Sequence, residues 1–248
     1  MLRQALFKKT RKKANFFVVE GERHLSELLQ SDWKILKIFA TPQKAKKIKS
    51  LIPLESAAEV EEISSKKLTE LAQTETPSGV LALVEKRSFA LDAVAAEKRV
   101  LILDNLRDPG NVGTLLRTAR SLGWSGVVLL KGTVELYSPK VVRSTAGALF
   151  HLKIVEGITA GETLNILKKV GFTVWVADSH SGVPPEACRG LINQTPTKLA
   201  LVIGSEASGV SQALLSQADQ FVRIPLSEGA ESLNASVSGG ILMCLLRT

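Results

Sequence analysis

The sequence predicts an α/β protein of two domains, a small domain followed by a larger one built on a mostly parallel sheet. Short strand and helix patterns alternate up to residue 86, and from Arg99 the strand segments become longer and nearly all apolar. Residues 87–98 interrupt the alternation between these two regions. A strand without polar alternation must be covered on both faces, which indicates a parallel sheet between helices. We place the domains at residues 1–92 and 93–248.

The first domain is expected to alternate strands and helices. The predicted strands are FFVVEG (16–21), ILKIFATP (35–42), VEEIS (60–64) and GVLALVEK (79–86). The predicted helices are GERHLSELLQ (21–30), QKAKKIKSL (43–51) and KKLTELAQ (66–73). In the first helix, His24, Leu25, Leu28 and Leu29 lie in helical register. Alternation of this kind is typical of a small α/β domain.

The second domain is expected to contain five buried strands. They are RVLILD (99–104), GVVLLK (126–131), TVWVAD (173–178), KLALVIG (198–204) and FVRIP (221–225). Parallel sheets of this type bind ligands in the loops at the carboxyl ends of their strands. A C-terminal helix should follow Ser232 and Asn234. Gly239 and Gly240 inside it cost roughly 1 kcal/mol each relative to Ala, which suggests close packing against another segment or subunit. Cys244 is expected to be buried there.

Composition excludes several classes of protein. The 248 residues are 45% hydrophobic, yet apolar runs such as LALVI and ILMCLL fall well short of a membrane span, so no membrane partner is expected. The start MLRQALFKKTRKK lacks the apolar core of a secretory signal. Cys188 and Cys244 do not form a disulfide framework, and the histidines lack metal-ligand spacing, so no metal site is expected. These features predict a soluble cytoplasmic protein.

Positive charge is concentrated near the N-terminus. Residues 1–50 hold 13 Lys and Arg against 4 Asp and Glu, a balance of +9, so the rest of the chain sums to −1 of the total +8. The basic positions are Arg3, Lys8, Lys9, Arg11, Lys12, Lys13, Arg23, Lys34, Lys37, Lys44, Lys46, Lys47 and Lys49. A solvated basic face would explain one lysine-rich helix. The gathering of the whole excess at one end favours a nucleic-acid partner.

The segment LDNLRDPGNVGTLLRTARSLG joins a strand to a helix and could bind an anion. Asn111 can cap the helix, and the amides of Gly110 to Gly113 would receive a negative group. Arg117 shares a face with Thr114 and Ser121. The segment matches neither a dinucleotide fingerprint nor a P-loop. Taken alone, it fits a capped helix with an exposed arginine equally well.

Two later loops also place small and polar residues at strand ends. In IGSEASG, Gly204 closes a strand and Glu206 follows it. The carboxylate could orient a ligand or cap the next helix, and in isolation capping is favoured. In IPLSEGAESLNAS, a strand ends at Ile224 and Pro225 and leads to Ser232 and Asn234.

The order and spacing of the three loops carry more information than each loop alone. NxGxxxR (Asn111, Gly113, Arg117), then IGSExxG, then IPxxxxxESLNAS resembles the motif set of the SpoU (TrmH-like) RNA ribose 2′-O-methyltransferases of the SPOUT superfamily. The resemblance covers residues 99–248. The preceding residues are similar to that family's substrate-binding domain, which has a ribosomal-protein-like α/β fold. The resemblance implies a C-terminal trefoil knot, S-adenosylmethionine as cofactor and a homodimer formed through the methyltransferase domain.

The resemblance also implies roles for individual residues. The cofactor would be bound by Gly204, Ile224, Ser232, Leu233 and Asn234. The catalytic residues would be Asn111, Arg117, Glu206 and Asn234. Arg117 would act either as the general base or as an electrostatic clamp on phosphate or the forming alkoxide. A neutral guanidinium is costly at neutral pH, which the first role would have to overcome.

We therefore expect an RNA ribose 2′-O-methyltransferase that acts on structured RNA, with large-subunit rRNA favoured over tRNA. One alternative is a non-catalytic RNA-binding or assembly protein on the same scaffold. The presence of Asn111, Arg117, Glu206 and Asn234 counts against it. A third interpretation, an anion-binding metabolic enzyme of the Rossmann type, predicts binding of a free nucleotide and no need for a basic first domain.

Overall fold

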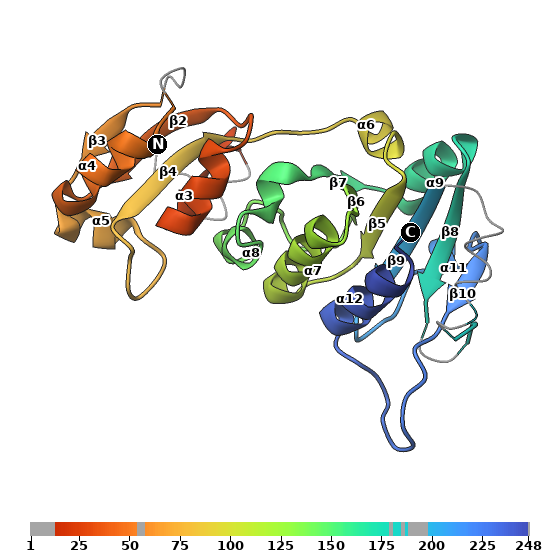
Figure 1. The fold of residues 1–248 in the computed structure, drawn as a ribbon. Helices are drawn as coiled ribbons and strands as arrows, with labels where there is room; N and C mark the ends of the chain where they lie inside the picture. Colours follow the sequence, from red (N-terminus) through yellow and green to blue (C-terminus); the bar gives the residue numbers. More distant parts are fainter. Residues whose placement is uncertain (1–12, 54–57, 179–180, 185–186, 188–197, 248) are drawn as a thin grey trace. The chain divides into compact units, whose positions relative to one another are not determined.

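The computed structural model divides the chain into two compact units, seen as a ribbon in Figure 1. It describes residues 13–53, 58–178, 181–184, 187 and 198–247. The first unit is the chain up to Arg87 together with Tyr137–His151. The second unit is Ser88–Leu136 together with the chain from Leu152 onward.

The first unit is built on a four-stranded mixed sheet, in the order β1-β4-β2-β3. Its elements are β1 (Phe16–Glu20), α3 (Glu22–Leu29), β2 (Ile35–Ala40), α4 (Pro42–Leu51), β3 (Val60–Glu62), α5 (Ser65–Leu71), β4 (Val80–Glu85), α8 (Pro139–Ser144) and the 3₁₀ helix η1 (Ala148–His151). Strand β4 runs antiparallel to β1 and β2, whereas β2 and β3 are parallel. The four strands and three helices predicted before residue 87 are confirmed.

An aromatic cluster joins the early chain to the distant segment that contains α8 and η1. The ring of Phe17 lies 4.6 Å from that of Tyr137 and 5.9 Å from that of Trp33, measured between centroids. The indole Nε1 of Trp33 donates a hydrogen bond of 3.1 Å to the carbonyl of Phe150. Because these four side chains are buried, Tyr137–His151 supplies part of the core of the first unit.

The second unit contains a six-stranded sheet in the order β10-β8-β9-β5-β6-β7, with every pair parallel. Its elements are α6 (Leu91–Ala95), β5 (Arg99–Asp104), α7 (Pro109–Ser121), β6 (Gly126–Leu130), β7 (Lys153–Ile158), α9 (Ala160–Lys169), β8 (Phe172–Ala177), β9 (Lys198–Gly204), α11 (Gln212–Leu215), β10 (Gln220–Val222) and α12 (Ala235–Leu245). The predicted parallel sheet is confirmed. Strand β7 was not predicted, because its sequence KIVEGI has no continuous apolar run.

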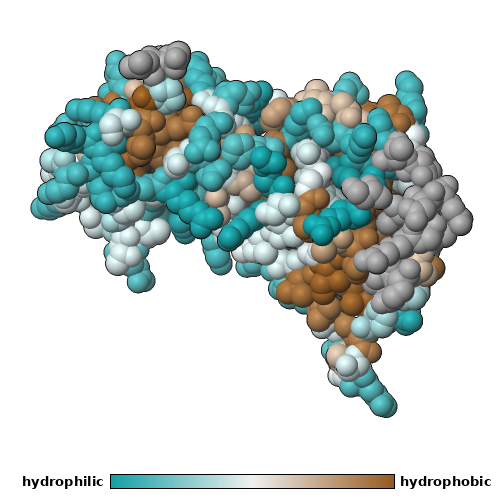
Figure 2. All heavy atoms as spheres, viewed as in Figure 1, coloured by the Kyte–Doolittle hydropathy of each residue, from teal (hydrophilic) through white to brown (hydrophobic). Residues whose placement is uncertain are grey.

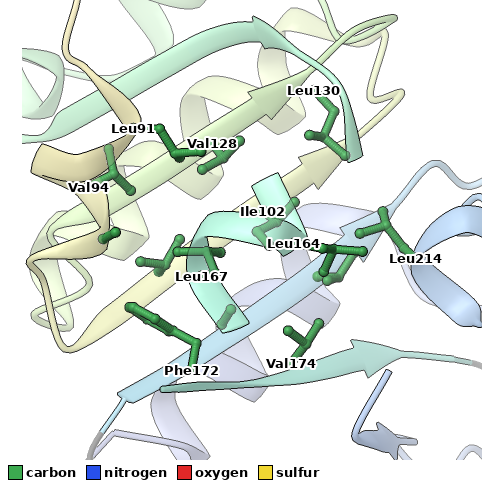
Figure 3. Close-up of a cluster of buried hydrophobic side chains, with 14 of the residues drawn as sticks. Leu91, Val94, Ile102, Val128, Leu130, Leu164, Leu167, Phe172, Val174 and Leu214 are labelled. Atoms are coloured by element: carbon green, nitrogen blue, oxygen red, sulfur yellow. The ribbon is translucent and has the colours of Figure 1, made fainter. Parts of the chain in front are cut away.

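Helices cover both faces of this sheet. On one face, α6, α9 and α11 enclose a hydrophobic core that Figure 3 shows in close-up. Leu164 and Leu167 of α9 meet Ile102 of β5 and Val174 of β8 in that core. On the other face, α12 packs against α7 and β9. Two covered faces explain why the strands are apolar without alternation.

The packing of α12 on α7 depends on a glycine. A Cβ atom on Gly239 would lie 2.4 Å from Cδ2 of Leu115, closer than real contacts allow. The predicted close packing is therefore confirmed at Gly239. The expectation that Cys244 is buried is wrong, since this residue is exposed. Helix α12 is apolar on nearly all sides, so its sequence does not reveal which side faces the core.

Candidate functional site

The first motif places Asn111 in the opening turn of α7. The helix begins at Pro109, and its cap is Asp108, whose carboxylate accepts a hydrogen bond of 2.8 Å from the amide of Asn111. The prediction that Asn111 caps the helix is therefore wrong. Residues 110–113 are helical and do not form an open anion-binding loop. The carboxamide of Asn111 is left to interact with residues from the other motifs.

Three side chains from the three motifs form one hydrogen-bonded network. Nδ2 of Asn111 donates to Oε1 of Glu206 at 3.1 Å. Nδ2 of Asn234 donates to the same Glu206 oxygen at 2.8 Å and to Oδ1 of Asn111 at 3.0 Å. The fold brings these residues together although Glu206 lies 95 residues, and Asn234 123 residues, after Asn111 in the sequence. The family resemblance implied one site for these three residues together with Arg117.

Glu206 and Asn234 also fix the start of α12. Asn234 is its cap, and Oδ1 accepts from the amide and hydroxyl of Ser236 at 2.9 and 2.6 Å. Oε1 of Glu206 accepts a further bond of 3.0 Å from the amide of Ala235. Glu206 therefore binds the first turn of a helix, as the capping interpretation predicted. That helix is α12, however, and not the next helix along the chain.

A cavity of about 440 Å³ lies beside this network, at the carboxyl ends of β8, β9 and β10. Four of the five predicted cofactor residues line it: Gly204, Ile224, Ser232 and Leu233. The fifth, Asn234, belongs to the network, and the neighbouring Ala235 lines the cavity. Sequence reasoning missed Asp178 in the wall, although an acidic residue directly after the strand TVWVA was a usable signal.

Gly204 is required by a tight turn in the cavity wall. Ser205 and Gly209 exchange two backbone hydrogen bonds, of 3.1 and 2.9 Å. A Cβ atom on Gly204 would lie 2.4 Å from the carbonyl carbon and oxygen of Gly209. Oδ2 of Asp104, at the end of β5, holds the next residues by accepting from the amide of Ser211 at 2.7 Å. A side chain at position 204 would thus displace the loop that forms the wall.

Arg117 does not join the other predicted catalytic residues within one chain. It is exposed on α7 and is absent from the lining of the cavity. Its carbonyl accepts a hydrogen bond of 2.9 Å from Ser121. It lies six positions after Asn111, which at about 100° per residue places the two on different sides of the helix. A single copy of the chain therefore presents the network and the arginine on separate surfaces.

The chemistry of the site is that of a polar network beside a partly apolar cavity. Ile203, Ile224, Leu226 and Leu242 supply apolar wall, and the 204–209 turn supplies backbone groups. Within the described part of the chain, no cluster of three or more His, Cys, Asp or Glu could hold a metal ion. The same residues include no helix that is long and apolar enough to cross a membrane.

A cavity at the carboxyl edge of a parallel sheet, with convergent polar side chains, defines an α/β protein that binds a small ligand in its loops. The chain belongs to the SpoU rRNA Methylase family, whose model matches residues 98–244. The model of an MRM3-like substrate binding domain matches residues 2–82. The resemblance inferred from the three motifs is confirmed.

Relatives and solved structures agree over nearly the whole chain. The chain is 33% identical over 242 residues to the 23S rRNA (guanosine(2553)-2′-O)-methyltransferase RlmP of Bacillus subtilis, covering 97% of this chain and 92% of the relative. An AdoMet-bound rRNA methyltransferase from Sinorhizobium meliloti has a TM-score of 0.87 at 26% identity, covering 99% of this chain and 92% of the other. The SpoU methyltransferase AviRb from Streptomyces viridochromogenes, in complex with AdoMet, has a TM-score of 0.84 at 27% identity, with 99% and 95% covered.

Proposed function

We propose that this chain is an S-adenosylmethionine-dependent RNA methyltransferase that methylates a ribose 2′-hydroxyl in large-subunit ribosomal RNA. Family membership and the RlmP relative support the reaction and the substrate. The observation that carries the proposal is the convergence of Asn111, Glu206 and Asn234 beside one cavity at the sheet edge. We assign the methyltransferase domain to residues 93–248 and the RNA substrate-binding domain to residues 1–92, with Tyr137–His151 of the former belonging to the compact unit of the latter.

The cavity residues fit S-adenosylmethionine. The cavity volume of about 440 Å³ lies within the usual range for small-molecule sites. Ile224 offers an apolar wall for adenine, and Gly204 and Leu233 offer backbone groups at the lining. Ser232 and Asn234 complete the set from the C-terminal loop. When bound, this cofactor supplies an electrophilic methyl group, so the protein has to position the hydroxyl and help to remove its proton.

The polar network prepares the acceptor side of the site. Glu206 accepts hydrogen bonds from both Asn111 and Asn234, which fixes the two carboxamides. Asn111 then orients the ribose or phosphate of the RNA. Arg117 binds phosphate or stabilises the forming alkoxide, or else removes the proton itself. In either role its guanidinium has to reach the network, which one chain does not provide.

A homodimer formed through the methyltransferase domain would bring Arg117 to the site of the other copy. Helix α12 exposes an apolar stripe at helical spacing: Val237 is 49% exposed, Ile241 is 36% exposed, and Cys244 is exposed as well. Figure 2 shows hydrophobic surface over this helix. Helix α7, which carries Arg117, packs beside α12. A symmetric contact through these helices would bury the stripe and pair each arginine with the partner's network.

We also propose that the C-terminal segment forms the trefoil knot of the SPOUT fold. The chain between β10 and α12 lines the same cavity as the 204–209 turn, and the two segments are in contact where Asn234 donates a hydrogen bond of 2.8 Å to Glu206. Knots are rare exceptions to the usual rules of chain connection. The proposal therefore depends on the family and on this contact between segments.

The first domain would supply electrostatic attraction for RNA. Several of its lysines already pair with carboxylates: Lys44 and Lys47 with Glu22, and Lys49 with Glu62. The lysines of α4 therefore offer less charge to RNA than the sequence indicates. Arg3, Lys8, Lys9, Arg11 and Lys12 lie outside the described residues. Action on ribosomal RNA would place the protein in the cytoplasm.

The test is to incubate the protein with S-adenosylmethionine and either ribosomal RNA or tRNA, and to map 2′-O-methylated nucleotides by mass spectrometry. Methylation of a single position in large-subunit rRNA is the expected result. Methylation of tRNA alone would show that the substrate is tRNA and not large-subunit rRNA. Binding of RNA with no methylation of either substrate would contradict the proposal and favour a non-catalytic assembly protein.

A further inference from the structure

A second hollow, of about 310 Å³, adjoins the cofactor cavity in the same unit. The two share the wall Ser205–Ser208 and Ala235. The rest of the second hollow is lined by Asn105, Leu106, Arg107, Asp108 and Asn111. Of these residues, the proposed catalytic set uses Asn111 and leaves the segment 105–108 without a role.

The segment after β5 has a fixed backbone that presents Arg107. Leu106 is 2% exposed, and its carbonyl accepts a hydrogen bond of 2.9 Å from the amide of Val134. Asn105 adopts a left-handed conformation with φ of 54°, which asparagine tolerates better than most other non-glycine residues. Arg107 is exposed beside this anchored residue, and its Nε donates to Oδ1 of Asn105 at 3.4 Å.

The glycine at position 132 leaves room for the side chain of Asn105. A Cβ atom there would lie 2.8 Å from Oδ1 of Asn105, which is the acceptor that orients the guanidinium of Arg107. Asn105 is thus a positioning residue that acts through Arg107. The remaining guanidinium donors of an arginine held in this way suit the oxygens of a phosphate.

The charge of the hollow restricts what it can bind. Its lining holds one cation, Arg107, and two carboxylates, Asp108 and Glu206, a formal sum of −1. Oδ1 of Asp108 accepts from the Asn111 amide, and Oε1 of Glu206 accepts from three N–H groups. A free phosphate ion would gain little in such a site. A phosphate carried by RNA that is already docked elsewhere on the protein would gain a charge-assisted contact.

We propose that this hollow receives the acceptor nucleotide and that Arg107 binds the phosphodiester next to the methylated ribose. The inference rests on the proposed function, because it needs an RNA substrate. Because Ser205–Ser208 and Ala235 line both hollows, the proposal places the acceptor ribose beside the loop that lines the cofactor cavity, and methyl transfer requires the two hollows to open into each other there. Arg107 therefore contributes to RNA placement and leaves the binding of cofactor to other residues.

The experiment compares Arg107→Ala, Arg107→Lys and Lys169→Ala with the unaltered full-length protein. Lys169 is an exposed cation in the last turn of α9, on the other face of the sheet, and controls for the loss of charge. We expect Arg107→Ala to lower kcat/KM for RNA roughly ten- to a hundredfold, as for loss of a charged hydrogen bond. The slope of log affinity for RNA against log salt should become shallower by about 0.7–0.9. Affinity for S-adenosylmethionine, measured by calorimetry, should not change.

Arg107→Lys should recover the salt slope and part of the activity, because it keeps the charge and loses the planar fork. Unchanged activity and slope in Arg107→Ala would overturn the inference. An unchanged slope with altered preference for the acceptor base would overturn it too, by showing a base contact. If the unaltered protein methylates no RNA, the proposed function fails, and the salt slope of RNA binding still decides the role of Arg107.

Discussion

The two units are built from the same alternation of strands and helices, yet their polar side chains are arranged differently. In the first unit, β4 runs against its neighbours, so the carboxyl ends of its strands are divided between two edges. In the second unit, all six strands end at one edge. The parallel sheet thus gathers the loops that hold Asn111, Glu206 and Asn234, whereas the charges of the first unit form separate surface pairs such as Lys37 with Glu61.

Strand direction therefore decides where polar loops can meet and form a site. Pairs such as Lys37 with Glu61 are exposed, and exposed pairs contribute little to stability, about 0–1 kcal/mol each. Changes at the edge of the second unit should therefore affect cofactor binding and catalysis strongly. Changes in the charges of the first unit should affect RNA affinity modestly and leave the cofactor site intact.

The largest effect is expected at Arg117. Arg117→Ala should lower kcat for methyl transfer by at least about a hundredfold, which is the usual cost of losing a group that stabilises a developing charge. Because each role proposed for this arginine concerns the RNA and none concerns the cofactor, affinity for S-adenosylmethionine should stay the same. Single-turnover kinetics and calorimetry measure the two quantities. Full activity in the variant would refute the catalytic assignment.

A matched pair of glycine substitutions tests the cavity wall. Gly204→Ala should lower cofactor affinity roughly ten- to a hundredfold, since overpacking costs about 1–3 kcal/mol and the clash is with the backbone of Gly209. Gly161→Ala is the control. Gly161 lies in α9 with open space around it, so alanine should leave binding unchanged and stabilise the helix by up to about 1 kcal/mol.

Calorimetry and thermal unfolding separate the two glycine variants. Equal cofactor affinity in Gly204→Ala and Gly161→Ala would show that the 204–209 turn is not part of the binding site. A loss of folded protein in both would point to a general effect of the substitution.

A smaller effect is expected when the first unit loses one carboxylate. Oxygens of Glu22 lie 2.5 Å from Nζ of both Lys44 and Lys47, and these lysines lower the pKa of Glu22. Glu22→Gln should release both lysines, raise RNA affinity a few-fold and steepen its salt dependence. Glu70→Gln removes the same charge from an exposed position on α5 and serves as the control. Filter binding at several salt concentrations that gives equal curves for both variants would refute the electrostatic role of this pair.

The smallest effect concerns His24, which is half-buried in the first unit. Burial lowers the pKa of His24, and nearby Arg23 and Arg143 lower it further, against a hydrogen bond from its ring to the carbonyl of Arg143. Below the ordinary histidine pKa of 6.5, the unfolded chain takes up a proton that the folded unit resists. Stability of the first unit should therefore fall as the pH drops through this range. An NMR titration midpoint for His24 at or above 6.5 would contradict this account.

Much of the fold could be predicted from the apolar pattern. The features that could not be predicted were missed for physical reasons. Strands such as LALVI are buried on both faces and were predicted for that reason. Strand β7 lies at the edge of its sheet, with exposed positions, and gave no such run. The packing of Tyr137–His151 into the first unit depends on contacts such as Trp33 with Phe150, which are 117 residues apart and leave no periodic trace.

The candidate site also has features that the sequence predicts and features that it does not. The resemblance carried by the three motifs implied one site for Asn111, Glu206 and Asn234, and these side chains meet in the structure. It did not predict that Asp108 caps α7, since both Asp108 and Asn111 are good capping residues and their positions relative to the first helical turn decide between them. The hollow beside Arg107 could not be predicted either, because it depends on the left-handed backbone of Asn105.

Hydrogen exchange with and without S-adenosylmethionine tests the central claim most directly. If the loops at the carboxyl edge of the second sheet form the cofactor site, added cofactor should slow exchange in residues 203–210 and 222–235. Exchange in the first unit, from residue 16 to residue 85, should not change. Slower exchange confined to the first unit, or no change in the two loops at saturating cofactor, would contradict the account.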